Sequence, residues 1–105
     1  MFVSTPGPAY AAFRSALNSG NLDRIRRTAR QLPAVRLEDA LAICVAYRDE
    51  PELYERAAIR WIGRFCLEAK GVGIEDVYQV AEALDRLPDH PERTAEELSR
   101  LIGRR

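Results

Sequence analysis

The chain has 105 residues with 16 basic and 16 acidic side chains, so its formal net charge is zero. This length fits one compact domain and leaves no room for two. Zero net charge excludes a bulk electrostatic attraction to nucleic acid or to a membrane, and an apolar fraction of 47% excludes global disorder.

Targeting and membrane signals are not expected. The longest apolar run, Ala40–Tyr47, is far shorter than the ~20 residues that span a bilayer. Residues 1–8 lack a basic region followed by an apolar one, so no secretory signal is predicted. Two cysteines, Cys44 and Cys66, are too few for a disulfide framework, and we therefore expect a cytoplasmic protein. Arginine makes up 15 of the 16 basic residues, a bias typical of GC-rich bacterial genomes.

The N-terminal third predicts two short helices after a flexible segment, residues 1–7. The first covers about 8–19, and Gly20 is a natural stop for it. Asn21 is a natural N-cap for a second helix over about 22–32, which Pro33 ends.

Two helices are predicted in the middle of the chain. The segment 37–48 is apolar on every side, which predicts burial on every side and a position in the middle of the fold. Pro51 suits the first turn of a longer helix that extends to about residue 69. The apolar stripe of that helix is Tyr54, Ala57, Ala58, Trp61, Ile62, Phe65 and Ala69.

The last third predicts two more helices. Gly71 and Gly73 break the chain, and a helix follows over about 74–87. Its predicted inward stripe is Ile74, Val77, Ala81, Leu84 and Leu87. A loop with two prolines leads to a final helix from about residue 92.

The fold class is therefore all-α, with six helices in one domain over 1–105. We expect three antiparallel hairpins at about 8–32, 35–70 and 72–105, either stacked like repeats or closed into a compact orthogonal bundle.

An internal repeat relates the second and third hairpins. Residues 35–47 align with 72–84, and residues 51–64 align with 91–104, with nine identities in 27 pairs. The spacing resembles that of helical-hairpin repeat proteins of the tetratricopeptide and HEAT kind, although no Trp-x-x-Leu-Gly pattern opens either repeat. That resemblance implies protein recognition without naming a partner. The stretch 54–66 also resembles small helical proteins of high-GC actinobacteria, and it brings no functional residues with it.

No pattern predicts catalysis, a metal site or a cofactor. The pairs Glu38–Asp39 and Glu75–Asp76 fall in first turns, where negative charge offsets the helix dipole. His90, the only histidine, has no neighbouring ligand cluster and is expected to flank the last helix. A bridge between the two cysteines is not expected, because the predicted hairpin separates them by roughly 15 Å. We expect Cys44 to lie in the hydrophobic core and Cys66 at the edge of the core.

Arginines form the candidate interaction surface. Residues 1–36 carry a net charge of +5 and residues 37–105 a net charge of −5. Arg24, Arg27 and Arg30 fall on the polar face of the second predicted helix. Arg56, Arg60 and Arg64 form a row at i, i+4 and i+8 on the fourth, where Glu52 and Glu68 can pair with its ends. The surface is interpreted either as a docking site for an acidic partner or as a solvated face.

The sequence favours a non-catalytic protein-interaction or adaptor module. The alternative is a nucleic-acid-associated regulator that uses the arginine face of residues 22–32. We expect the partner to be another protein with an acidic surface, or a second copy of the chain bound through the fourth or sixth predicted helix. We do not expect the chain to bind a membrane.

Overall fold

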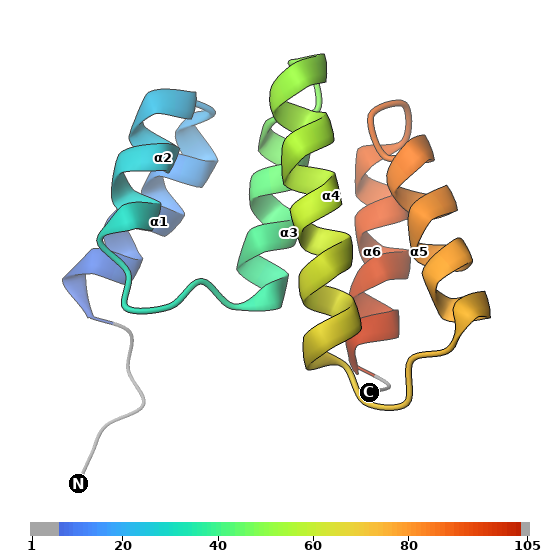
Figure 1. The fold of residues 1–105 in the computed structure, drawn as a ribbon. Coiled ribbons are helices and arrows are strands. Elements are labelled where there is room, and N and C mark those ends of the chain that lie inside the picture. Colours follow the sequence, from blue (N-terminus) through green and yellow to red (C-terminus); the bar gives the residue numbers. More distant parts are fainter. Residues whose placement is uncertain (1–6, 104–105) are drawn as a thin grey trace, which may run out of the picture. The chain divides into compact units, whose positions relative to one another are not determined.

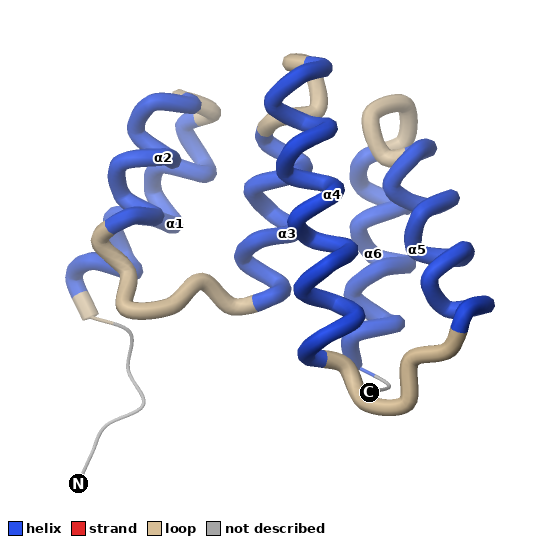
Figure 2. Tube along the Cα trace, viewed as in Figure 1, coloured by secondary structure: helices blue, strands red, loops and turns tan. Residues whose placement is uncertain are grey.

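The computed structural model describes residues 7–103, so the predicted flexibility of residues 1–6 and the repeat position Arg104 lie outside the described residues. The structure is all-α, and the described part of the chain contains no strand (Figures 1 and 2). Its helices are α1 Pro8–Ser19, α2 Leu22–Arg30, α3 Leu37–Ala46, α4 Pro51–Glu68, α5 Ile74–Arg86 and α6 Pro91–Gly103. The predicted helices are therefore all present: five of the six begin at the predicted residue, and the boundaries that differ do so by one or two residues.

Contacts divide the chain into two compact units, residues 1–35 and 36–105. In the first unit α1 packs against α2. The predicted stop and cap are confirmed: Gly20 has a φ of 72°, and the Asn21 side chain accepts a hydrogen bond from the Arg24 amide at 3.1 Å. Phe13 of α1 and Ile25 of α2 are completely buried.

The four helices of the second unit close into a bundle. Each of them packs against two others, in the order α3 on α4, α4 on α5, α5 on α6, and α6 on α3. Figure 1 shows α4 and α5 running in opposite directions in front of α3 and α6. Of the two predicted arrangements, stacked hairpins or a compact bundle, this ring of contacts corresponds to the bundle for residues 36–105. The arrangement of all three predicted hairpins in one domain stays a prediction.

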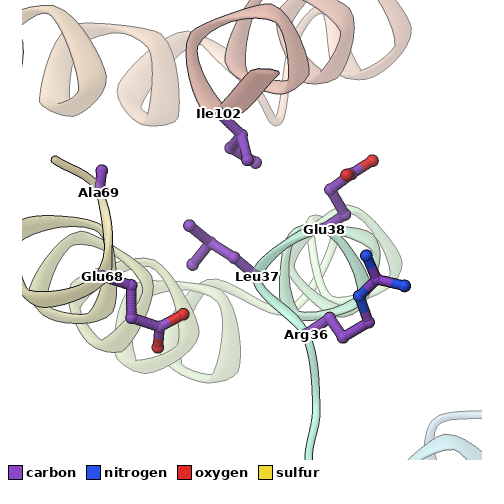
Figure 3. Close-up of a pocket in the computed structure, with 6 residues that line it drawn as sticks. All are labelled: Arg36, Leu37, Glu38, Glu68, Ala69 and Ile102. Carbon is purple, nitrogen blue, oxygen red and sulfur yellow. The ribbon is translucent and has the colours of Figure 1, made fainter. Parts of the chain in front are cut away.

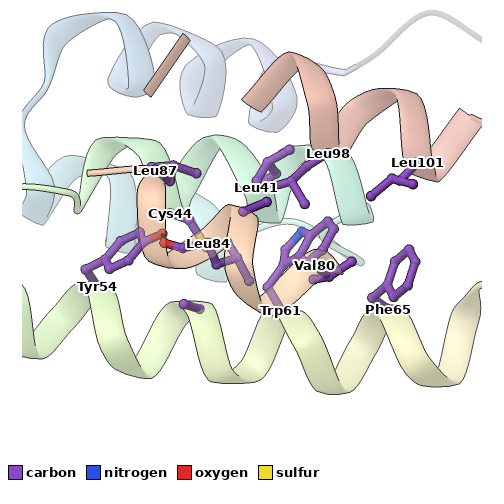
Figure 4. Close-up of a cluster of buried hydrophobic side chains, with 12 residues drawn as sticks. Leu41, Cys44, Tyr54, Trp61, Phe65, Val80, Leu84, Leu87, Leu98 and Leu101 are labelled. Carbon is purple, nitrogen blue, oxygen red and sulfur yellow. Dashed lines mark hydrogen bonds between the residues drawn. The ribbon is translucent and has the colours of Figure 1, made fainter. Parts of the chain in front are cut away.

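The core of the second unit lies inside this ring (Figure 4). Trp61 and Phe65 stack with ring centroids 5.6 Å apart, and both are buried against side chains from α3, α5 and α6. The Trp61 indole donates a hydrogen bond to the Leu37 carbonyl at 2.9 Å, which ties α4 to the first turn of α3. The stripe predicted for α4 is thus confirmed at its four most buried positions, Tyr54, Ala58, Trp61 and Phe65.

Helix α3 is less enclosed than its sequence predicts. Leu41 and Cys44 are buried, but Ile43 and Val45 are only half-buried. The expectation that this helix is buried on every side is therefore wrong for residues 36–105. The reason is the bundle, in which a helix has two neighbours and keeps one side outward.

The helix starts and the buried positions can be compared with the sequence alignment. α3 and α5 begin at Leu37 and Ile74, and α4 and α6 begin at Pro51 and Pro91, the spacings that the sequence alignment gives. Three aligned pairs are buried in both α4 and α6: Tyr54 with Thr94, Ala58 with Leu98, and Trp61 with Leu101.

The correspondence fails between α3 and α5. Leu41 and Cys44 are buried in α3, but the aligned Tyr78 and Ala81 are exposed in α5. Ile74, which the sequence places on the inward stripe together with Ala81, is 75% exposed. The inward assignment of these two residues is therefore wrong. Leu84 and Leu87 are buried as predicted, and Val80 and Ala83 are buried beside them.

Candidate interaction surface

Exposed apolar side chains are concentrated on α4 and α5. Among residues 7–103 the large hydrophobic side chains that are exposed are Ile59 at 63%, Leu67 at 86%, Ile74 at 75% and Tyr78 at 69%. The first two belong to α4 and the last two to α5, which are neighbours in the bundle. Large apolar side chains gathered on one face of a small protein are typical of an interaction site. This α4–α5 face is defined here by these four residues.

A groove runs between the two helices, and Ile59 is the one of these four residues that lines it. It has a volume of about 430 Å³, and its lining is mostly apolar. Ile59, Ile62 and Ala81 line its length, and Tyr54 and Leu84 lie at its inner wall. Its lining residues come from α4, α5 and the turns beside them: Arg48, Pro51, Tyr54, Glu55, Ala58, Ile59, Ile62, Ala81, Leu84, Asp85 and Pro88.

The helices of the α4–α5 face carry exposed charges of both signs, and Glu52 and Glu55 of α4 and Asp85 of α5 are among them. On α4, Arg56 and Arg60 are exposed outside the groove, and on α5, Glu75 and Glu82 are exposed outside it. No ion pair joins any of these four side chains to another residue in the described range 7–103. Their charges are therefore available to a partner.

The predicted arginine row on α4 separates into two kinds of residue. Arg64 is half-buried, and its Nε lies 2.7 Å from the Glu68 carboxylate, as the i, i+4 spacing predicts. Arg56 and Arg60 are exposed. Only the latter two can therefore present an unneutralised positive charge.

The arginines of α2 belong to the other unit and form a separate set. Arg27 and Arg30 are exposed, and Arg24 is half-buried. The opposite side of α2 carries the buried Ile25, so the predicted polar face exists. The two arginine sets lie in different units of the chain.

A second cavity of about 320 Å³ lies at the start of α3, lined by Arg36, Leu37, Glu38, Glu68, Ala69 and Ile102. Figure 3 shows Glu38 and Glu68 on opposite sides of the Leu37 side chain. Glu68 is also occupied by its ion pair with Arg64. The two carboxylates therefore do not converge as acid–base catalysis requires.

The remaining candidate groups have structural surroundings. Asp76 accepts a hydrogen bond from the Gly73 amide at 2.9 Å and so caps α5. The His90 carbonyl accepts from the Thr94 amide at 3.1 Å, which places His90 directly before α6, as predicted. Cys44 is buried, and Cys66 is exposed rather than at the core edge, so the assignment of Cys66 is wrong. Both cysteines are free.

Two buried groups have perturbed acidity. Burial raises the pKa of the Cys44 thiol from 9.0 to about 12. Burial also raises the pKa of the Tyr54 phenol above its ordinary value, and the nearby Cys44 and Asp85 add to the shift. Both groups stay protonated at neutral pH, so neither supplies a nucleophile.

Within residues 7–103 no group of three or more histidine, cysteine or acidic side chains could hold a metal ion. In the same range no helix is both long enough and apolar enough to cross a bilayer. No protein-family model, no curated protein and no solved structure matches the chain.

The α4–α5 face is the feature that sequence reasoning missed. The signal was present: Ile59 and Leu67 lie off the stripe that contains Trp61, and Tyr78 lies off the predicted inward stripe of α5. Apolar residues outside the core stripes of two helices form a common face only if the two helices are neighbours. The sequence does not show that α4 and α5 are neighbours, and the fold does.

Proposed function

We propose that this chain is a non-catalytic protein-interaction module that binds a protein partner through the α4–α5 face. The observation that carries the proposal is the gathering of Ile59, Leu67, Ile74 and Tyr78 on two adjacent helices, beside an apolar groove. Covering these side chains would remove them from water, which is the main driving force of protein association.

The charges around the face suit a partner with both signs of charge. A polar rim around an apolar centre is the usual anatomy of a protein interface. Arg56 and Arg60 offer positive charge on α4, where Glu52 and Glu55 are also exposed, and Glu75 and Glu82 offer negative charge on α5. The acidic partner expected from the arginines alone is thereby replaced by a partner of mixed charge. The two free cysteines are compatible with the cytoplasm as the compartment.

The test compares partner binding by matched variants. Tyr78→Glu places a charge at an exposed apolar residue of the face, and Gln79→Glu adds the same charge at the next residue, which is also exposed. Proteins crosslinked to the tagged chain in the producing cells, copies of the chain itself included, are identified, purified and titrated against each variant. We expect at least one partner that binds the wild type and Gln79→Glu equally and Tyr78→Glu about tenfold more weakly. Equal binding of every partner to all three proteins would contradict the proposal.

Nucleic-acid binding by the first unit is the second candidate function. The observation in its favour is the arginine content of residues 7–35, five arginines against Asp23 alone, with Arg27 and Arg30 exposed on α2. This candidate predicts binding to a labelled DNA duplex or single strand that weakens steeply with salt. It also predicts loss of that binding in Arg27→Glu. Fluorescence anisotropy without a salt-dependent signal would exclude it.

A further inference from the structure

We infer that the groove between α4 and α5 binds a lysine or arginine side chain of the partner protein together with an apolar side chain beside it. The inference rests on the proposed function, because it names the chemistry by which the partner of the α4–α5 face is recognised. Its basis is the lining of the groove, which combines apolar side chains with two carboxylates that form no ion pair within residues 7–103.

The acidic side chains of the lining are Glu55 on α4 and Asp85 on α5, and both are exposed. The lining contains one basic residue, Arg48, which is half-buried. Its guanidinium donates a hydrogen bond to the Val45 carbonyl at 2.8 Å, at the C-terminal end of α3, where a positive charge is favourable. The groove therefore has an excess of negative charge, and its cation is already bonded to α3.

A hydrogen bond shows where the two carboxylates lie. The Tyr54 hydroxyl donates to the Leu84 carbonyl, so α4 and α5 are joined at this point. Glu55 follows Tyr54 and Asp85 follows Leu84, so both carboxylates border the groove near the same contact. Burial, Cys44 and the charge of Asp85, in that order, raise the pKa of the Tyr54 phenol, as the proximity of Asp85 requires.

The apolar part of the groove lies on one side of this contact. From Tyr54 the lining continues along α4 to Ile59 and Ile62, and from Leu84 it continues back along α5 to Ala81. Because α4 and α5 run in opposite directions, these two stretches extend the same way from the Tyr54–Leu84 contact (Figure 1). A ligand in the groove therefore meets the carboxylates first and apolar side chains about one helical turn further on.

Lysine and arginine side chains have the chemistry that this arrangement requires. Their methylene stems pack on apolar surface while the charged head group reaches a carboxylate. A cation near Glu55 and Asp85 would also offset the repulsion between these two like charges. An apolar side chain three or four residues away on a helix of the partner would then lie over Ile59 and Ala81.

A protein segment fits this site better than a free organic amine because the groove adjoins a larger apolar surface. Ile59 is 63% exposed, and it belongs both to the groove and to the α4–α5 face. Only an occupant larger than the groove covers Ile59 together with the rest of that face. Arg56 and Arg60 are exposed on α4 without lining the groove, so they remain for acidic groups of the same partner.

The first experiment tests the chemistry of the groove with small probes. Phenylbutylamine carries an apolar ring and an ammonium group, phenylbutanol is its uncharged analogue, and phenylbutyrate carries a negative charge instead. Each is titrated into the isotope-labelled full chain, and the backbone amide signals are followed by NMR. We expect the amine to shift the amides of Glu55, Ile59 and Asp85 and to bind about fivefold more tightly than the alcohol. Phenylbutyrate is expected to bind more weakly than both.

Matched variants assign this preference to the two carboxylates. Glu55→Gln with Asp85→Asn removes the negative charges of the lining. Glu75→Gln with Glu82→Gln removes two exposed negative charges of α5 that do not line the groove. The first double variant is expected to bind amine and alcohol equally, and the second is expected to keep the preference of the wild type. Far-ultraviolet circular dichroism confirms that each variant is folded.

The second experiment uses the partner that depends on Tyr78. We expect Glu55→Gln with Asp85→Asn to weaken its binding about tenfold, and more than Glu75→Gln with Glu82→Gln does. Replacing the basic residue of the partner by glutamine is expected to weaken binding to the wild type by the same factor. It should cause no further loss in the groove variant, because the interaction is then already absent.

Two results of the titration would overturn the inference: an alcohol that binds as tightly as the amine, or a preference that survives Glu55→Gln with Asp85→Asn. A partner that loses binding to Tyr78→Glu but binds the groove variant like the wild type would also overturn it, and the proposed function would stand. A groove that selects the amine while no protein depends on its carboxylates would show a free amine as the occupant, and the inference would again be wrong. If no protein depends on Tyr78, the proposed function and the inference are both wrong.

Discussion

The hydroxyl of Tyr54 on α4 donates a hydrogen bond to the main-chain carbonyl of Leu84 on α5. Four residues after Leu84 the chain has Pro88, which carries no N–H and cannot make the helical hydrogen bond to that carbonyl. The tyrosine hydroxyl supplies the donor that the proline removes. One side chain thus ties two helices together and satisfies a buried acceptor near the end of α5.

Removing this hydroxyl is expected to destabilise the second unit. Tyr54→Phe leaves the Leu84 carbonyl unpaired in a buried site, which costs about 1–3 kcal/mol of unfolding free energy. Urea unfolding followed by the fluorescence of Trp61, the single tryptophan, measures the change. Tyr78→Phe is the control, because Tyr78 is exposed, and its stability should match that of the wild type. Equal stability of both variants would show that the Leu84 carbonyl does not need this donor.

A second prediction concerns a hydroxyl without a partner. Thr94 on α6 is completely buried, and its side-chain oxygen makes no hydrogen bond in the structure. Valine has nearly the same shape and no polar atom, so Thr94→Val is expected to raise the unfolding free energy by about 1 kcal/mol. Thr94→Ala leaves a cavity and should lower it. A Thr94→Val protein less stable than the wild type would mean that the hydroxyl has a donor or acceptor in solution.

Helix α3 gives a prediction that separates its two sides. Leu41 is 3% exposed, and Leu41→Ala is expected to cost about 2–5 kcal/mol. Ile43 is half-buried, so Ile43→Ala should cost less, about 1–2 kcal/mol. Thermal or urea unfolding of the two variants side by side gives the order. If Ile43→Ala lost more stability than Leu41→Ala, Ile43 rather than Leu41 would be the residue that faces the core.

Sequence reasoning was most successful where a local rule decides the structure. Gly20 and Asn21 end and begin helices because of backbone conformation and capping, which depend on near neighbours only. Pro51 begins α4 for the same kind of reason, whereas Pro91, predicted to lie in the loop, is the first residue of α6. The apolar stripe that contains Trp61 could be predicted from the sequence, because polar residues occupy most of the other side of α4.

It failed where two helical rows of apolar residues compete for one core. Helix α5 carries Ile74 and Tyr78 on one side and Val80 and Leu84 on another, and both rows have helical spacing. Which row faces inward depends on the direction from which α4 and α6 approach, and a single sequence does not contain that direction. The candidate site was missed for the same reason: charge could be read along α4, but the groove exists only once α4 lies against α5.

The two cysteines are expected to differ in reactivity. Cys66 is exposed and Cys44 is buried, and burial raises the pKa of the Cys44 thiol to about 12. Because the thiolate is the reactive form, a disulfide reagent at neutral pH should modify one thiol per folded chain and both thiols in denaturant. Cys66→Ser removes the fast reaction and identifies the site. Two thiols reacting at equal rates in the native protein would contradict the burial of Cys44.

Alkaline pH is expected to destabilise the protein through Cys44 and Tyr54. Both groups have a raised pKa in the folded state, so the folded chain keeps protons that the unfolded chain loses above its ordinary values of 9.0 and 10.0. Stability is therefore independent of these groups below about pH 9, and it falls as pH rises further, by up to ~1.4 kcal/mol per pH unit for each group.

Urea unfolding at a series of pH values between about 8 and 11 measures this slope. Cys44→Ala should remove the part that begins near pH 9, and Tyr54→Phe the part that begins near pH 10, whatever each variant costs at neutral pH. Tyr78→Phe, which changes an exposed phenol, should leave the slope unchanged. A slope that survives in both buried-site variants would assign the alkaline transition to other groups and would contradict the burial of these two.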